Sequence, residues 1–521
     1  AVPTQRWSLS DWVDRSQLTD VQLGCVQHGG FVANTELFDQ KFFGVPPAEA
    51  AAMDPQQRML LEIGYEALHM AGLSTLDVRG TNTAVVVGLE RPEWPQVAEA
   101  TGASTSIYAV TGGTISIVPG RVGFVLGLHG PCMAIDTACS SALNGSHWAA
   151  SATRNAECDL ALSTGVSIKL LPIVTVGLAS AGMLSPDGRA KTFDERANGY
   201  IRCDGLPATV LSSTGKHSAM YVASAVGGDG KSASLTAPNG SAQKLVLKAA
   251  MKRAGLDADE IGCLQAQGLG SALGDPTEVG AVMQVLGGDR DTALTLGSHK
   301  ANFGHAEAPS GLMGLLCSWE VVQSKASFGN MQLRILHSFL SQIFAGSPPP
   351  TCVPTQLSTG STLGACSVTA YGFSGVIAHG ILQAVPIKDE GVPKDPKMKR
   401  LRFKHSRYPW RATPHPFVQE KVYHSSDEAV FRSPAQGAFV SAVADHIIMG
   451  GIVFPGAGYV LMAEAAGRAL APKAALVQLR AVFFLQPLLL TADSNTTIEI
   501  VFRPGRGYEI ASGLLMGNDL E

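Results

Sequence analysis

Short apolar runs alternate with helical segments along the first three quarters of the chain. A run at 133–135 fits a buried strand, and the stretch 140–150 after it is rich in small residues that suit a tightly packed helix. Buried strands are also expected at 83–88 and 158–168, and a helix is expected to begin after Asp54, a suitable N-cap. This alternation is typical of a layered α/β fold.

The same rhythm continues in the second half of this region. The pattern predicts helices at 242–254 and 311–322, a strand ending at 263–267 and another at 294–297. This region is expected to end with a pair of strands at 366–386. Two halves with a similar order of elements indicate a duplicated core.

A long loop at 184–205 interrupts the pattern. It reads L-S-P-D-G-R-A-K-T-F-D-E-R-A-N-G-Y-I-R-C-D-G and is rich in Gly and Asp. Loops of this length in compact domains are usually functional. We expect it to serve a site or a subunit contact.

The composition changes at 386–411, where Pro, Lys and Arg concentrate. This stretch is interpreted as a linker. A different domain is expected after it, with a helix at 457–470 and strands near 477–490 and 497–502. The pattern indicates a β-rich sheet with one central helix.

The composition describes a protein with a large buried core. The 521 residues favour two to four domains, and 45% of them are hydrophobic while 16% are charged. A net charge of -4 argues against nucleic acid as the main partner. Nine cysteines without a C-x-x-C pair favour free thiols in a reducing compartment, and the pattern supports no metal site. No run approaches the roughly 18 to 20 apolar residues of a membrane span.

Location is not decided by this sequence. The first residues, A-V-P-T-Q-R-W-S, contain neither a signal peptide nor an initiating Met. A cytoplasmic or an organellar protein is equally compatible with them.

Cys139 lies at the predicted turn between the strand at 133–135 and the helix that follows. A thiol there lies at the positive end of the helix dipole and close to unpaired backbone N–H groups. Both effects favour the thiolate, so the sequence predicts a nucleophile at Cys139. The alternative is a buried cysteine that only packs.

Four stretches place Cys139 in a wider pattern. They are I-D-T-A-C-S-S-A around Cys139, Q-A-Q-G-L-G-S-A-L-G-D-P-T-E at 265–278, S-H-K-A-N-F-G-H at 298–305 and G-F-S-G-V-I-A-H at 372–379. Their order and spacing resemble the ketosynthase (β-ketoacyl synthase) domain of modular polyketide synthases and type I fatty acid synthases. The resemblance implies a thiolase-like fold, two related halves forming an α/β/α/β/α sandwich, and usually a homodimer.

The resemblance assigns roles residue by residue. Cys139 corresponds to the nucleophile that takes an acyl chain from an acyl carrier protein, where phosphopantetheine carries the chain. The backbone N–H groups of Cys139 and Phe373 correspond to the oxyanion hole, and His305 to the histidine used in decarboxylation. Lys300 corresponds to the lysine near the site, with Glu307 as its expected ion partner. No directly bound cofactor is implied.

The sequence departs from the family at a catalytic position. Gln267 stands where the family has the histidine of H-G-T-G-T. A glutamine amide can donate a hydrogen bond, but it can neither transfer a proton nor become cationic. Losing one donor in such a site typically costs about 10² to 10³ in rate. Cys203 and Asp204 replace the usual Gly-Glu, and Val376 and Ile377 the usual Thr-Asn. We therefore consider chain transfer without elongation, weak condensation, and a non-catalytic docking scaffold.

The last part of the chain resembles a polyketide synthase dehydratase. H-I-I-M-G-G-I-V-F-P, beginning at His446, matches the H-x-x-x-G-x-x-x-x-P motif, and H-P at His415 resembles the usual start. The resemblance implies an α+β hot-dog fold in which His446 removes an α-proton. No second-half D-x-x-x-Q motif is present, so we expect this part to be inactive alone. The alternative for His446 is a packing role.

These patterns divide the chain into four parts. They are a ketosynthase N-terminal half at 1–216 without the family's usual first strand, a C-terminal half at 217–386, the linker at 387–412, and a partial dehydratase hot-dog at 413–521. No G-H-S-x-G transferase motif lies between them, so extender loading would need a separate acyltransferase. The direct ketosynthase-to-dehydratase order favours polyketide over fatty acid synthesis.

Overall fold

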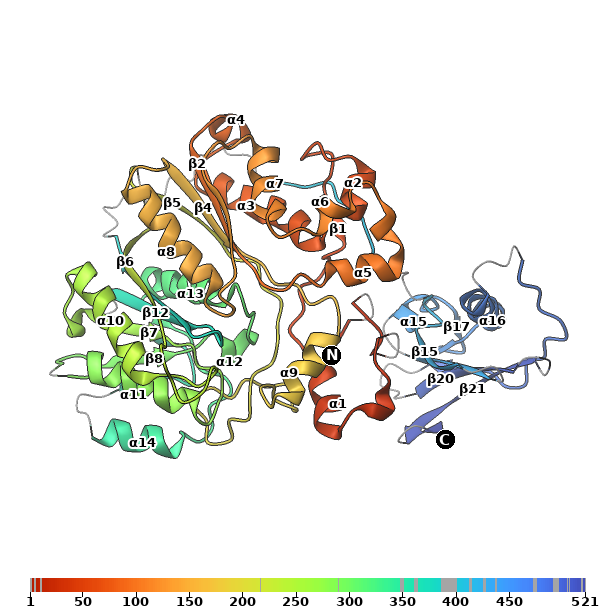
Figure 1. Ribbon diagram of the computed structural model, residues 1–521. Coiled ribbons are helices and arrows are strands. Elements are labelled where there is room, and N and C mark those ends of the chain that lie inside the picture. The colour runs from red at the N-terminus through yellow and green to blue at the C-terminus, as the bar shows by residue number, and fades with distance from the viewer. Residues whose placement is uncertain are drawn as a thin grey trace. The chain divides into compact units, whose positions relative to one another are not determined.

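The computed structural model contains two compact units, which are described separately. The larger comprises residues 1–2 and 17–410, and the smaller comprises residues 3–16 and 411–521 (Figure 1). The structure describes residues 2–3, 6–9, 12–215, 217–288, 290–346, 351–359, 364–385, 401–411, 415–424, 428–435, 438–471, 476–490, 496–503, 505, 507–516 and 519–520.

The first sheet of the larger unit has the order β3-β2-β4-β5. Its strands are β3 (Cys132–Ile135), β2 (Thr83–Gly88), β4 (Leu160–Gly165) and β5 (Ala208–Ser212), and only β5 runs antiparallel to its neighbour. β2 is buried throughout, as expected. The strand predicted at 133–135 is present as β3, but the expectation that it is buried was wrong, because β3 lies at the sheet edge and is half-buried.

The second sheet has six strands within the described residues. Its centre is parallel and one side is antiparallel. In spatial order the strands are β10 (Thr351–Cys352), β8 (Leu294–Gly297), β7 (Ile261–Gln265), β12 (Ala365–Tyr371), β13 (Val376–Ala384) and β6 (Ala219–Gly228).

Two helices, α8 (Ser141–Arg154) and α13 (Ser310–Ser324), form the layer between the sheets (Figure 1). They pack closely because small residues line their contact. A Cβ atom on Gly311 would lie 2.7 Å from the Cβ of Leu143. Outer helices complete the α/β/α/β/α sandwich, so the predicted layered fold is confirmed.

The remaining helices of this unit lie on the outer faces of the sheets and in the segments that connect the strands (Figure 1). The N-terminus of α3 is capped as predicted, since the Asp54 side chain accepts a hydrogen bond from the Gln56 N–H at 2.8 Å. These helices are α1 (Asp20–Val26), α2 (Pro47–Ala52), α3 (Pro55–Met70), α4 (Thr75–Val78), α5 (Trp94–Thr101), α6 (Ala109–Gly113), α7 (Ile117–Leu126), α9 (Ile173–Ser180), α10 (Gly240–Ala254), α11 (Gly274–Leu286), α12 (Lys300–Phe303) and α14 (Ser338–Ala345).

The second part of the expected linker is ordered on the larger unit. β14 (Ser406–Arg407) pairs antiparallel with β1 (Leu37–Phe38). The Arg58 guanidinium lies 5.4 Å from the ring centre of Tyr408, and its Nη1 donates to the Tyr408 carbonyl. The sequence predicted a linker over 387–412, but its described residues 401–411 include a strand that pairs with β1. Residues 387–400 lie outside the described part. A separate small sheet pairs β9 (Ala326–Ser327) with β11 (Ser358–Thr359).

The smaller unit is a curved sheet with one long helix, α16 (Gly456–Leu470), as predicted. The sheet strands are β15 (Glu420–His424), β16 (Ala429–Pro434), β20 (Thr496–Arg503), β21 (Gly507–Met516) and β22 (Asp519–Leu520). A second sheet has β17 (Ile447–Ile448), β18 (Gly451–Val453) and β19 (Leu489–Leu490), and the unit also contains the short helix α15 (Ala438–Ser441).

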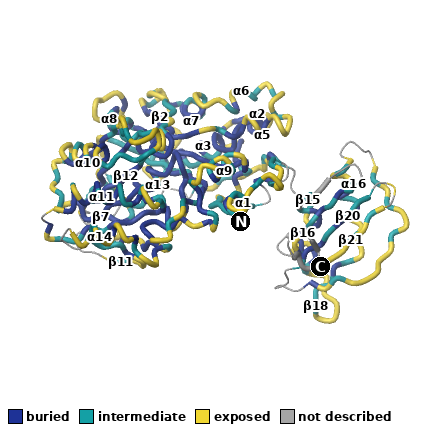
Figure 2. The backbone as a smooth tube through the Cα atoms, turned by 60° about the horizontal axis from the view of Figure 1, so that its bottom comes forward, coloured by how far each residue is buried: buried dark blue, intermediate teal, exposed yellow. Residues whose placement is uncertain are grey.

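One prediction in this unit was wrong. Within the expected strand at 477–490 only β19 is a strand. Phe483 and Leu485 of this segment are 79% and 91% exposed, and Figure 2 shows much of the segment in the exposed colour. Apolar composition suggested a strand, but a strand forms only where a neighbouring strand accepts its backbone hydrogen bonds.

Candidate active site

Cys139 lies in the turn that joins β3 to α8. Its Sγ atom is 3.0 Å from Nε2 of His305. Ala138, the residue before it, has a left-handed backbone with φ of 54°, a conformation that costs about 1 kcal/mol or more for a residue with a side chain. Backbone strain beside a paired cysteine is typical of a functional turn.

Burial favours the neutral forms of both members of this pair. Burial raises the pKa of the Cys139 thiol far above its ordinary value, and the carboxylates of Glu90 and Glu307 raise it further, while Lys300 lowers it. Burial and the nearby Lys300 lower the pKa of His305 well below its ordinary value. The helix dipole favours the predicted thiolate, whereas desolvation of the charge opposes it.

The long loop at 184–205 holds His305 in position. The Tyr200 ring meets the His305 ring edge-on, with centroids 4.9 Å apart. The Cys203 N–H donates to the His305 carbonyl at 2.9 Å, and the His305 N–H donates to the Ile201 carbonyl at 2.8 Å. The expectation that this loop serves a site agrees with these contacts.

Lys300 and Glu307 are both buried, but the expected ion pair between them is wrong. Glu307 accepts hydrogen bonds from Arg202 at 2.7 and 3.0 Å and lies 3.1 Å from Nζ of Lys169. Burial lowers the pKa of Lys300 to about 8, and the carboxylate that most opposes this shift is Glu278. Arg202 and Lys169, rather than Lys300, are therefore the ion partners of Glu307.

Gln267 is buried at the end of β7. Its Nε2 donates to the Tyr371 carbonyl at 3.1 Å, and its Oε1 has no hydrogen-bond partner among the described residues. Its backbone N–H donates to Oε1 of Glu278 at 2.8 Å. One of the two amide N–H groups of Gln267 is thus bonded within the protein.

The turn that carries Phe373 packs against the Cys139 turn. A Cβ atom on Gly372 would lie 2.2 Å from the Thr137 carbonyl oxygen, so only glycine fits there. The Ser374 hydroxyl donates to the same carbonyl at 3.4 Å. The main chain around Phe373 and that of Cys139 therefore lie close together.

Several buried charged residues around the site were not singled out from the sequence. These are Glu90, Lys169, Arg202 and Glu278, each less than 9% exposed. Lys169 could have been recognised from the sequence, because a lysine inside the apolar run V-S-I-K-L-L at 166–171 is expected to be buried and to need a charged partner. Glu90, Arg202 and Glu278 could not, since the sequence does not show which charged side chains the fold buries.

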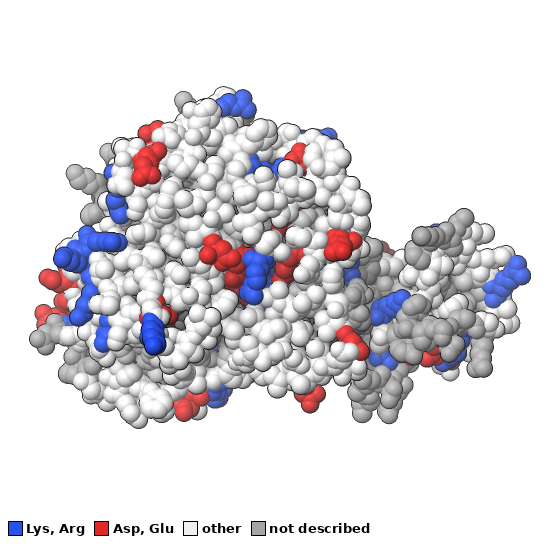
Figure 3. Space-filling model, viewed as in Figure 1, with Lys and Arg blue, Asp and Glu red and all other residues white. Residues whose placement is uncertain are grey.

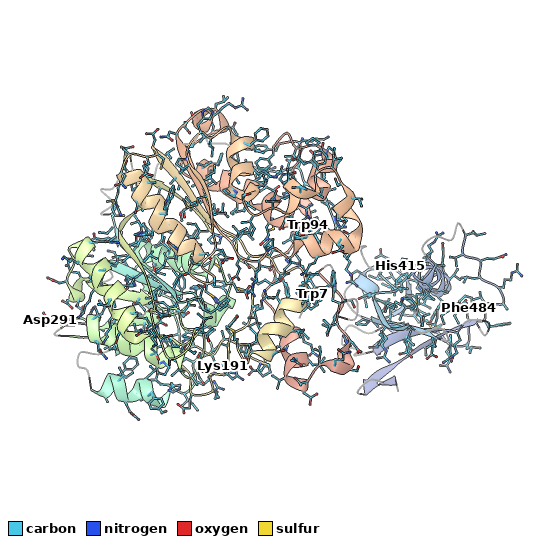
Figure 4. All side chains as sticks on the ribbon, viewed as in Figure 1. Trp7, Trp94, Lys191, Asp291, His415 and Phe484 are labelled. Carbon is cyan, nitrogen blue, oxygen red and sulfur yellow. The ribbon has the colours of Figure 1, made fainter. Side chains whose placement is uncertain are left out.

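His446 lies in the smaller unit, ahead of the β17–β18 hairpin, and is exposed. Its Nδ1 donates to the Val453 carbonyl at 2.6 Å, which leaves Nε2 as the basic nitrogen. His415 packs edge-on against Phe417, with centroids 5.5 Å apart, and Figure 4 labels it with Phe484 in this unit. His305 contacts Cys139, and the charges of Lys300 and Glu307 act on its thiol, whereas His446 lies in the smaller unit.

A five-layered sandwich with a cysteine–histidine pair at a turn leading into a central helix is the arrangement of the thiolase-like class of proteins. Comparison with family models is consistent with it. Residues 1–217 match the N-terminal domain and 218–331 the C-terminal domain of β-ketoacyl synthase, and residues 415–512 match the polyketide synthase dehydratase domain. The chain belongs to the β-ketoacyl synthase family, as a modular polyketide synthase ketosynthase followed by dehydratase sequence.

Individual relatives agree with this assignment. Mycoketide-CoA synthase of Mycobacterium tuberculosis is 38% identical over 74% of this chain, and erythronolide synthase of Saccharopolyspora erythraea is 36% identical over 70%. The chain spans only 9% and 10% of these two proteins. A ketosynthase from module 6 of the bacillaene synthase of Bacillus subtilis has 29% identity and a TM-score of 0.66, covering 74% of this chain and 67% of that one. Within the described residues, no helix has the length and apolarity to cross a membrane.

Proposed function

We propose that the larger unit transfers acyl chains from the phosphopantetheine of an acyl carrier protein onto Cys139, and that it elongates them poorly. The observation that carries this proposal is the 3.0 Å contact between Sγ of Cys139 and Nε2 of His305. A thiol within hydrogen-bond reach of a neutral imidazole is the usual arrangement of an activated nucleophile.

The proton follows a short path in this reaction. Nε2 of His305 accepts the thiol proton as Sγ of Cys139 attacks the carbonyl carbon of the incoming thioester. The main-chain N–H groups of Cys139 and Phe373 stabilise the negative charge on the carbonyl oxygen. The tetrahedral intermediate collapses, the carbon–sulfur bond to pantetheine breaks, and His305 returns the proton to the leaving thiolate. A neutral pair suits this path, because no ion has to be desolvated beforehand.

Elongation needs more from the site. Decarboxylation of a malonyl thioester builds charge on an enolate oxygen, and hydrogen-bond donors must meet it. Lys300 and His305 remain, but Gln267 offers only a neutral amide, one N–H of which already donates to the Tyr371 carbonyl. Transfer without elongation is therefore the favoured function, and weak condensation is the second candidate.

Intact mass measurement after incubation with an acyl-pantetheine thioester tests the transfer. An adduct is expected on the wild-type protein and is expected to vanish in Cys139→Ala. Cys352→Ala is the matched control, because Cys352 is a partly exposed free thiol on β10 in the other sheet. An unmodified wild-type protein would support the docking scaffold instead.

Malonyl-carrier protein then separates transfer from condensation. Little chain lengthening and little carbon dioxide are expected after its addition to the acylated protein. Efficient lengthening would contradict impaired elongation. A separate acyltransferase is the partner that would load this extender.

The larger unit forms a homodimer in this proposal. β3 is an edge strand with exposed Cys132, and Phe124 on the neighbouring α7 is 87% exposed. A second copy that pairs along β3 would cover this apolar surface. Light scattering should give twice the monomer mass for the wild-type protein and a shift toward monomer for Phe124→Asp.

The smaller unit is assigned a role in removing water from β-hydroxyacyl thioesters. Nε2 of His446 is placed to remove an α-proton, and an acid from elsewhere would protonate the leaving hydroxyl. Conversion of a 3-hydroxyacyl pantetheine thioester by the chain alone is expected to be slow. Fast conversion that survives His446→Ala would contradict the role of His446.

A further inference from the structure

A small charged cavity lies beside the proposed acylation site. Glu90, Arg91, Arg202 and Glu307 contribute to its lining, and its free volume of about 10 Å³ is close to what one water-sized group needs. Arg202 is bridged to His305 through the backbone, and Glu307 follows His305 by two residues. The cavity therefore adjoins the histidine that contacts Cys139.

Glu90 enters this region from the carboxyl end of β2. β2 and β3 are parallel neighbours, so the segment after β2 and the Cys139 turn after β3 lie at the same sheet edge. Glu90 is 7% exposed, and its Oε1 has no hydrogen-bond partner among the described residues. A buried carboxylate oxygen without a donor costs stability unless a ligand supplies one.

Arg91 supplies the complementary group. Its backbone has a φ of 28°, an unusual value for a residue with a side chain, and its guanidinium carbon lies 6.0 Å from the ring centre of Phe373. No hydrogen bond ties this guanidinium to any described residue, and its contact with Glu90 is 4.0 Å long. Its donors are therefore available close to the turn that carries Phe373.

The charges around the cavity balance one another. Glu90, Glu93 and Glu307 face Arg91, Arg202 and Lys169, and the side chains other than Arg91 are nearly buried. Figure 3 shows acidic and basic side chains gathered near the middle of an otherwise largely uncharged face of this unit. A neutral group that both donates and accepts a hydrogen bond fits such a place better than an ion or an alkyl chain.

We propose that Glu90 and Arg91 select hydroxylated acyl chains, with the substrate hydroxyl donating to Oε1 of the Glu90 carboxyl group and accepting from the Arg91 guanidinium. The inference rests on the proposed acylation of Cys139 and names the class of its substrate. A hydroxyl oxygen has the size of the water-sized space in the cavity. A saturated chain would leave the buried Oε1 of Glu90 without a hydrogen-bond donor.

Competing thioesters of equal chain length test this selection. Hexanoyl, 3-hydroxyhexanoyl and 5-hydroxyhexanoyl pantetheine are offered to the full chain, and the initial rate of Cys139 adduct formation is followed by intact mass. At least one hydroxylated chain is expected to react about tenfold or more faster than hexanoyl. Equal rates for all three would overturn the inference but leave the proposed function intact. No adduct from any of them would overturn both.

Variants identify the groups responsible. Glu90→Leu and Arg91→Met should bring the rate ratio between hydroxylated and saturated chains close to one. Glu90→Gln should keep much of the ratio, because its amide oxygen still accepts from a hydroxyl. Glu99→Gln, on an exposed face of the adjacent α5, is the matched control and should leave the ratio unchanged. A ratio that stays high in both Glu90→Leu and Arg91→Met would also overturn the inference.

Discussion

Sγ of Cys139 lies 3.0 Å from Nε2 of His305, and both side chains are buried. The first prediction concerns this contact. His305→Ala should slow acylation of Cys139 by about 10² to 10⁴, because no other base lies on the proposed proton path. Rapid-quench intact mass gives the rate, and His129→Ala, an exposed histidine, is the control. A loss of less than fivefold would remove His305 from the path.

The second prediction concerns the thiol itself. Because burial raises the pKa of Cys139, the thiolate fraction should increase with pH without reaching a plateau in the accessible range. Alkylation of Cys139 by iodoacetamide, followed by peptide mass, should therefore still accelerate between pH 8 and about 9.5. A plateau below pH 8 would mean that the helix dipole dominates after all.

The third prediction concerns Gln267. Gln267→His restores an imidazole at the end of β7, where Glu278 and Thr369 already bind the backbone N–H. Condensation with malonyl-carrier protein should increase by about 10 to 10³, as expected for one recovered donor. Carbon dioxide release and product mass measure it. No gain would show that Cys203, Asp204 or the strand at 376–377 limits elongation more strongly.

The fourth prediction concerns Glu90 and stability. Burial raises the pKa of Glu90 from 4.5 to about 7, and Glu307 adds to the shift. The protonated form is favoured in the fold, so its stabilisation is fully present below pH 4.5 and is lost as the pH rises through about 7. Glu90→Gln lacks this loss and should gain about 3 kcal/mol in free energy of unfolding, relative to the wild type, between pH 4 and pH 8.

Denaturant unfolding of both proteins across this pH range measures the effect. The wild type and Glu90→Gln should be most alike at low pH and diverge as the pH rises. A difference in unfolding free energy that is independent of pH would show that Glu90 titrates normally in the folded protein. Glu99→Gln again serves as the control, because Glu99 is exposed.

The sequence predicted the layered fold because periodicity and burial act locally. The strand at 83–88 and the helix capped by Asp54 follow directly from their own residues. The same local reasoning failed at 477–490, where apolar residues without strand neighbours stay irregular. It also overestimated the burial of β3, since the sequence does not reveal which strand lies at a sheet edge.

The residues around the candidate site were determined in two stages. Short motifs with a fixed order predicted Cys139, His305 and Gln267 as members of one site, and the contact between Cys139 and His305 agrees with this prediction. Their protonation states and partners depend on groups more than 100 residues away, such as Arg202 against Glu307, and on how much solvent the fold excludes. Desolvation and long-range ion pairing arise only when distant segments meet, and so only the tertiary structure revealed that burial opposes the Cys139 thiolate and that Glu307 pairs with Arg202 and Lys169 rather than with Lys300.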